Sequence, residues 1–226
     1  MLTSAHGARL IPVGPIAHGP AEEVEALVIV VHGGKANSME PVRPWRSAVL
    51  RLRPVARRIA HDTTSPRAAV YRLQLAIRGW NGTGSSALAD LYWALATLQS
   101  SHPDRPVVLV GHSMGARTVL HLAGQEKVCG VVVLAPWVET ADPVSQLAGV
   151  RVTAIQGTQD RITPEPASRA FVARAEAAGA QWEQVLLTGT GHGMVSRAKT
   201  WHRLTAEAVR ADLDRCIADR RSPGRG

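Results

Sequence analysis

Short apolar runs alternate with longer segments of helical periodicity along most of this chain. Six runs rich in Val, Ile, Leu and Ala are predicted to be strands: Ala26–Val31, Ala69–Ala76, Pro106–Val110, Val128–Ala135, Val150–Gln156 and Trp182–Leu187. Several of them are apolar at every position, as strands must be when both of their faces are buried. A further short strand is expected near Arg9–Val13.

Helical patterns fill the intervals between the later strands. They cover Pro44–His61, Ala87–Ser100, Ala116–Gln125, Pro166–Ala178 and Ser196–Ala218. In the second of these, four leucines recur at helical spacing and form one apolar stripe. Regular alternation of strands and helices predicts an α/β fold, with a mostly parallel central sheet of about six to seven strands and helices on both faces.

The length of 226 residues suits a single domain with one buried core. We expect an irregular segment over residues 1–24, the α/β domain over 25–218, and a flexible tail over 219–226, which is charged and contains Pro and Gly. No apolar run is long enough to span a bilayer, and the first twenty residues hold no continuous apolar stretch typical of a secretion signal. A cytoplasmic location is therefore expected.

Arginine dominates the basic residues and gives the chain a formal net charge of +8. The arginines are spread along the chain, and no stacking aromatics accompany them, so we expect no nucleic-acid partner. One cluster lies in Trp45–Arg58, where apolar residues recur at helical spacing and place Arg46, Arg53 and Arg57 on the opposite face. A solvated helix face is the simpler interpretation, and attraction of anionic substrates is the alternative.

The two cysteines, Cys129 and Cys216, are far apart in the sequence. Such spacing favours neither a metal site nor a disulfide scaffold, and we interpret both as small buried apolar residues. No cofactor or metal is expected.

The candidate catalytic residues lie directly after the predicted strands. In a parallel sheet, the residues beyond the carboxyl ends of the strands form the active site. Three such segments contain a serine, an aspartate and a histidine in that chain order: Gly111-His112-Ser113-Met114-Gly115, Gly157-Thr158-Gln159-Asp160 and Gly189-Thr190-Gly191-His192. An earlier strand is followed by His32-Gly33-Gly34-Lys35.

From about Glu25 to Ala218, the sequence resembles the α/β-hydrolase family. The resemblance rests on the G-x-S-x-G elbow between a strand and a helix, the H-G-G stretch, and the order Ser, Asp, His. It implies an α/β-hydrolase fold, with Ser113 as nucleophile, His192 as general base and Asp160 as the residue that orients the imidazole. Only about fourteen residues separate the fourth and fifth long strands, so no cap domain is expected.

The same resemblance implies an oxyanion hole made by backbone N–H groups. Met114, which follows the nucleophile, would supply one donor, and Gly34 the other, with Lys35 as the second choice. Bulky side chains at Gly111 or Gly115 would collide with neighbouring backbone in so sharp a turn.

Other residues compete for these roles. Asp142 and Glu139 follow the fourth long strand, where some hydrolases place their acid, but the loop around Asp160 resembles the usual acid loop more closely. His202 lies within a helical pattern, so His192 is the preferred base. His32 and His112 are expected to be structural.

Four residues are candidates for the substrate pocket: Lys35, Trp80, Trp137 and Met194. Trp80 stands where many relatives have the histidine of an Arg-Gly-His-Gly segment. Trp137 and Met194 suit packing in the core as well as they suit a pocket wall.

The expected function is hydrolysis of a carboxylic ester through an acyl-enzyme intermediate. A thioesterase is the first alternative, and a repurposed or non-enzymatic ligand-binding member is the second. The expected partner is a small-molecule ester or thioester, and the sequence leaves the oligomeric state open.

Overall fold

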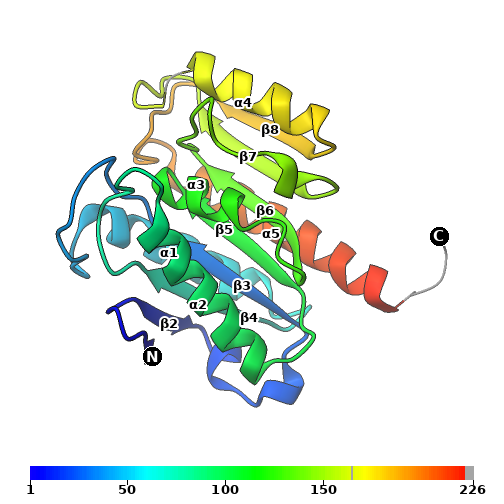
Figure 1. Ribbon diagram of the computed structural model, residues 1–226. Coiled ribbons are helices and arrows are strands. Elements are labelled where there is room, and N and C mark those ends of the chain that lie inside the picture. The colour runs from blue at the N-terminus through cyan, green and yellow to red at the C-terminus, as the bar shows by residue number, and fades with distance from the viewer. Residues whose placement is uncertain (164, 222–226) are drawn as a thin grey trace.

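The structure is a computed structural model that describes residues 1–163 and 165–221. Within these residues, eight strands form one sheet in the order β1-β2-β4-β3-β5-β6-β7-β8 (Figure 1). The strands are β1 (Leu2–Thr3), β2 (Arg9–Val13), β3 (Ala26–Val31), β4 (Ala68–Gln74), β5 (Val107–His112), β6 (Val128–Leu134), β7 (Arg151–Gly157) and β8 (Gln181–Leu187).

The sheet is parallel from β4 to β8 and antiparallel at its N-terminal edge, where β2 pairs with both β1 and β4. The expected mostly parallel α/β sheet is therefore confirmed. Residues 1–24 are less irregular than expected, because β1, β2 and two short 3-10 turns join this segment to the sheet.

Helices cover both faces of the sheet (Figure 1). In the described residues they are α1 (Ser47–Asp62), α2 (Ser85–Ser101), α3 (Met114–His121), α4 (Glu165–Ala177) and α5 (Ala198–Arg221). One core cluster packs α1 and α5 against the sheet, and the other packs α2, α3 and α4 against the opposite face.

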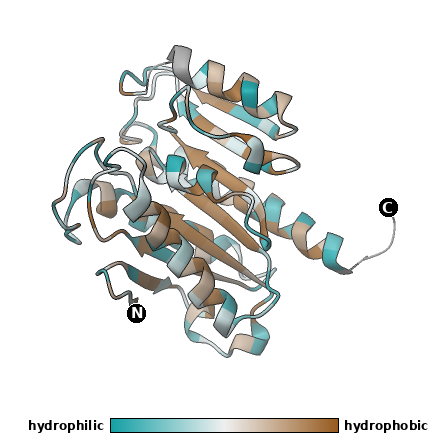
Figure 2. Ribbon diagram, viewed as in Figure 1, coloured by the Kyte–Doolittle hydropathy of each residue, from teal (hydrophilic) through white to brown (hydrophobic). Residues whose placement is uncertain are grey.

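The strand sequences explain this two-sided burial. In β3, Leu27 and Ile29 belong to one core cluster, while Val28 and Val30 belong to the other. Successive side chains of a strand point to opposite faces, so an uninterrupted apolar run supplies both cores. Figure 2 shows the inner strands as continuous hydrophobic ribbons between helices of mixed character.

Three helix boundaries differ from expectation by three residues or more. α1 begins at Ser47 rather than at Pro44. α3 ends at His121 rather than near Gln125, because Leu122 and Ala123 donate to carbonyls only three residues back and tighten the last turn. α5 continues to Arg221, three residues beyond the expected end of the domain at 218. Residues 222–226 of the expected tail lie outside the described residues.

The connection between β6 and β7 is short. Residues 135–150, all of them described, form a loop with one 3-10 turn, Ser145–Leu147, so no cap domain is inserted there. None of the helices in the described residues is long and apolar enough to cross a membrane.

The expectation of two unpaired cysteines was wrong for this structure, in which a disulfide joins Cys129 to Cys216. α5 packs on β6 and brings the two Cα atoms to 6.0 Å, within the usual range for a disulfide. The separation of 87 residues conceals this proximity in the sequence.

Candidate active site

Ser113 occupies a sharp turn between β5 and α3. Its backbone has φ 54° and ψ −117°, a conformation that residues other than glycine rarely adopt. Gly111 and Gly115 make the turn sterically possible. A Cβ atom at Gly111 would lie 2.6 Å from the backbone of Ala116, and one at Gly115 would lie 2.6 Å from the His32 carbonyl oxygen. Both glycines are therefore required for space.

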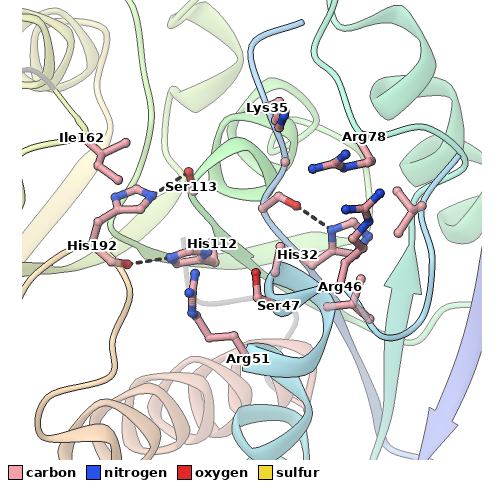
Figure 3. Close-up of a pocket in the computed structure, with 15 residues that line it drawn as sticks. His32, Lys35, Arg46, Ser47, Arg51, Arg78, His112, Ser113, Ile162 and His192 are labelled. Atoms are coloured by element: carbon pink, nitrogen blue, oxygen red, sulfur yellow. Dashed lines mark hydrogen bonds between the residues drawn. The ribbon is translucent and has the colours of Figure 1, made fainter. Parts of the chain in front are cut away.

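The structure brings the serine, the histidine and the aspartate into one hydrogen-bonded chain (Figure 3 shows Ser113 beside His192). His192 Nε2 lies 2.9 Å from Ser113 Oγ, and His192 Nδ1 lies 2.9 Å from Asp160 Oδ2. Asp160 comes from the loop after β7, and His192 from the loop after β8. A carboxylate partner requires Nδ1 to carry the proton, which leaves the Nε2 lone pair for the serine hydroxyl.

Asp160 is held as a carboxylate. Its side chain is only 1% exposed, and this burial alone would raise its pKa. The hydrogen bond from His192 and those from the backbone N–H groups of Ile162 and Thr163, at 2.9 Å and 3.3 Å, outweigh the burial and bring the pKa of Asp160 below its ordinary value. The negative charge can therefore stabilise an imidazolium on His192.

The loops that carry Asp160 and His192 are bound to each other. Gln159 N–H donates to the Thr190 carbonyl at 2.9 Å, and Gly157 packs so closely on Thr190 that a Cβ there would overlap its backbone. The aspartate and the histidine are therefore positioned together.

Two buried neutral histidines support the surrounding loops. Burial lowers the pKa of His112 to about 3, and its Nε2 lies 3.0 Å from the His192 carbonyl oxygen, to which it donates. Burial also lowers the pKa of His32 to about 4. Its Nδ1 lies 2.7 Å from the Gly33 carbonyl, and its Nε2 accepts the Leu75 N–H at 3.1 Å. Their contacts are those of positioning residues.

Two backbone donors near the serine are free. The N–H groups of Gly34 and Met114 donate to no acceptor among the described residues. Lys35 differs, because its N–H donates to the Arg78 carbonyl at 2.8 Å. The two segments approach closely, since a Cβ at Gly34 would collide with the Met114 side chain. Gly34 and Met114 thus keep donors available for an oxyanion, whereas the Lys35 amide is occupied.

The competing residues lie elsewhere. Asp142 is buried against the Arg117 guanidinium, with the shorter contact at 2.5 Å, and Glu139 lies 3.0 Å from the same group. Neither carboxylate contacts His192. His202 is in α5, as the helical pattern indicated.

A pocket of about 310 Å³ opens beside Ser113 and His192. Its walls come from the loop after β3, the first turns of α1, Arg78, and Ile162 in the loop after β7. Four cationic side chains line it, Lys35, Arg46, Arg51 and Arg78, and no carboxylate of the described residues does so (Figure 3).

Of the four pocket candidates, only Lys35 lies in this wall. Met194 is 3% exposed and packs in the core beneath α5, and Trp80 is equally buried. Trp80 and Trp137 meet edge to face and both contact the Arg117 guanidinium. In the sequence, a large aromatic residue in a loop looks the same whether it packs against the protein core or lines a substrate pocket.

The sequence alone did not place any arginine beside Ser113. A solvated helix face was the simpler interpretation for Arg46, with attraction of anionic substrates as the alternative, and Arg46 lines the pocket. Arg51 was not singled out. A usable signal was present, because a helix that follows a parallel strand begins at the carboxyl edge of the sheet. Ser47 and Arg51 are four residues apart, so they share the face of α1 that meets this edge.

Comparisons with known proteins agree with this architecture. The chain is 19% identical to an alpha-beta serine hydrolase homologue from Coxiella burnetii, with a TM-score of 0.67, covering 92% of this chain and 94% of that one. It is 13% identical to Est1E from Butyrivibrio proteoclasticus, solved with ferulic acid, with a TM-score of 0.66 over 92% and 96% of the two chains. A propionate-bound thermophilic esterase, Est2 from Thermogutta terrifontis, is 15% identical, with a TM-score of 0.65 over 92% and 89%.

At the sequence level, residues 76–154 match the family model described as serine aminopeptidase, S33. This segment includes the turn around Ser113 but neither Asp160 nor His192. No curated protein sequence is significantly similar to the chain. The sheet topology, the structural similarity over nearly the whole chain and the family match lead to one conclusion: this chain is an α/β-hydrolase-fold protein.

Proposed function

We propose that this protein is a serine hydrolase that cleaves carboxylic esters through an acyl-enzyme intermediate. The observation that carries the proposal is the hydrogen-bonded chain from Ser113 Oγ through His192 to Asp160, with contacts of 2.9 Å at both steps. A serine hydroxyl is a weak nucleophile at neutral pH, and a base within hydrogen-bond reach activates it.

The reaction proceeds in two halves. Ser113 Oγ attacks the ester carbonyl carbon while its proton passes to His192 Nε2. The negatively charged oxygen of the tetrahedral intermediate then accepts hydrogen bonds from the backbone N–H groups of Gly34 and Met114. His192 then protonates the departing alcohol, and the C–O bond breaks to leave acyl-Ser113. Water attacks this ester and gives a proton to His192 Nε2. As the second tetrahedral intermediate collapses to the free acid, His192 returns that proton to Ser113 Oγ, which restores the hydroxyl and the neutral imidazole.

Amino-terminal peptide cleavage is a second candidate because the matched family model carries the name serine aminopeptidase. The pocket disfavours it. A free amino terminus is cationic and needs an acidic partner, whereas the side chains that line this pocket include four cations and no carboxylate among the described residues.

The proposal is tested with a fluorophosphonate probe and a substrate panel. We expect the probe to label the wild-type protein and not Ser113→Ala. The panel compares 4-nitrophenyl esters of increasing chain length with matched acyl-thioesters and aminoacyl 4-nitroanilides. Preference for esters supports the proposal, and strong preference for thioesters makes the chain a thioesterase. Absence of both labelling and turnover would leave a non-enzymatic ligand-binding role.

A further inference from the structure

The pocket beside Ser113 is cationic in a way that ester hydrolysis does not require. Ester cleavage uses a nucleophile, a base and an oxyanion hole, all of which are neutral before the reaction starts except Asp160. The four cationic side chains of the wall therefore remain without a role in the chemistry.

Arg51 is the best placed of the four. It lies on α1 below His112 (Figure 3), and its guanidinium lies 3.6 Å from where a Cβ at Gly193 would be, so it reaches the loop that carries His192. It makes no hydrogen bond or ion pair with any of the described residues, although the side chain is partly buried. Burial lowers the pKa of Arg51, but arginine stays charged.

The other cations differ in their partners. Arg46 and Arg78 lie on the side of the pocket away from His192 (Figure 3), and both contact the carboxylate of Glu40, Arg46 at 3.2 Å. Lys35 is exposed at the edge of the pocket and has no ion-pair partner within the described residues. Glu40 thus offsets part of the charge of Arg46 and Arg78, whereas no ion pair within the described residues offsets the charge of Arg51.

Backbone donors reinforce this charge. Ser47 and Ala48, the first residues of α1, line the pocket, and their backbone N–H groups donate to no acceptor among the described residues. The first turn of α1 contains no acidic side chain that would cap them. Free amides are usual in the first turn of a helix, but Ser47 and Ala48 line the same pocket as Arg51.

We infer that the substrate carries an anionic group, a carboxylate or a phosphate, and that the Arg51 guanidinium binds this group while Ser113 attacks the ester. A planar guanidinium matches both groups through paired charge-assisted hydrogen bonds. This inference rests on the proposed ester hydrolysis and names its substrate class. Arg51 acts as a specificity residue, and Arg46, Arg78 and Lys35 draw anions toward the pocket.

The test compares each anionic ester with a neutral counterpart of similar shape. Mono-4-nitrophenyl adipate is paired with 4-nitrophenyl hexanoate, which places the charge on the acyl side. 4-Acetoxybenzoate is paired with its methyl ester, which places the charge on the leaving side. The measured quantity is the ratio of kcat/KM for the anionic ester to that for the neutral ester.

We expect the wild-type ratio to exceed that of Arg51→Gln by about ten-fold or more for at least one pair, and to fall as salt is added. Arg57→Gln is the matched control, since Arg57 is exposed on the same helix and outside this pocket, and it should keep the wild-type ratio. Equal ratios for wild type and Arg51→Gln in both pairs would overturn the inference while ester hydrolysis stands.

A direct binding measurement separates this inference from the proposed function. Calorimetric titration of benzoate and phenyl phosphate into Ser113→Ala and into Ser113→Ala/Arg51→Gln needs no turnover. Weaker binding to the double variant supports the role of Arg51 even if no ester is cleaved, and the tighter ligand identifies carboxylate or phosphate. Equal binding to both variants counts against it.

Discussion

Removal of the Cys129–Cys216 disulfide should destabilise the fold strongly. The bond ties the start of β6 to α5 across 87 residues of chain. In the chain-entropy description, a cross-link over a loop of that length lowers the entropy of the unfolded state by an amount equivalent to about 4.6 kcal/mol at 25 °C. With a urea m-value of about 2.5 kcal/mol/M, the unfolding midpoint of Cys129→Ala/Cys216→Ala should fall by about 1.8 M.

The assay is urea unfolding of the wild type and the double variant, each with and without dithiothreitol, together with a count of free thiols in the denatured oxidised protein. We expect no free thiol in the wild type, a midpoint that falls on reduction, and a variant that is indifferent to the reductant. Two free thiols would show that the bond is absent. No free thiols with an unchanged midpoint would refute the loop-entropy reasoning itself.

Three further predictions concern the site. Asp160→Asn should lower kcat on a cleaved ester by about three to four orders of magnitude with little change in KM, because an amide does not fix the His192 tautomer; a change confined to KM would contradict the assigned role. Gly115→Ala should lower the melting temperature and abolish ester cleavage, since the new Cβ would lie 2.6 Å from the His32 carbonyl oxygen. Gly19→Ala is the control: its Cβ would have its nearest neighbour at 3.5 Å, so melting temperature and ester cleavage should stay unchanged. The pKa of His112 is about 3 in the folded protein and 6.5 in the unfolded chain, so between these pH values His112 takes up a proton only on unfolding. The stability that neutral His112 contributes at neutral pH is therefore lost as the pH falls from 6.5 toward 3, by roughly 1 kcal/mol of unfolding free energy per pH unit. The unfolding free energy of His112→Asn, measured by chemical denaturation between pH 7 and pH 4, should therefore fall less steeply with pH than that of the wild type. Equal slopes would show that His112 does not cause this pH dependence.

The predictable part of this protein was the part that strand periodicity and chain order determine. The uninterrupted apolar run Ala26–Val31 predicts a strand, because a strand that is buried on both faces needs apolar side chains at every position. The structure has a strand with the same bounds. Ser113, Asp160 and His192 were predicted to lie close together from their positions after strands, because the ends of parallel strands meet at one edge. The structure brings those three side chains together.

What the sequence did not indicate depends on contacts between distant elements. Cys129 and Cys216 approach each other only because α5 crosses β6, and no local pattern records that crossing. Trp80 and Trp137 were candidates for the pocket because they follow strands, but both rings pack against the Arg117 guanidinium and neither lines the pocket. Arg51 was overlooked because a helical period shows which residues share a face and not which surface that face meets.

The backbone of Ser113 has a consequence for how this fold responds to selection. A serine held at φ 54° and ψ −117° occupies a conformation in which glycine alone is unstrained. Replacement of Ser113 by glycine would relieve that strain and remove the hydroxyl that lies 2.9 Å from His192 Nε2. Mutagenesis screened for thermal stability alone would thus favour loss of the proposed nucleophile, and only a screen that also demands turnover would retain it.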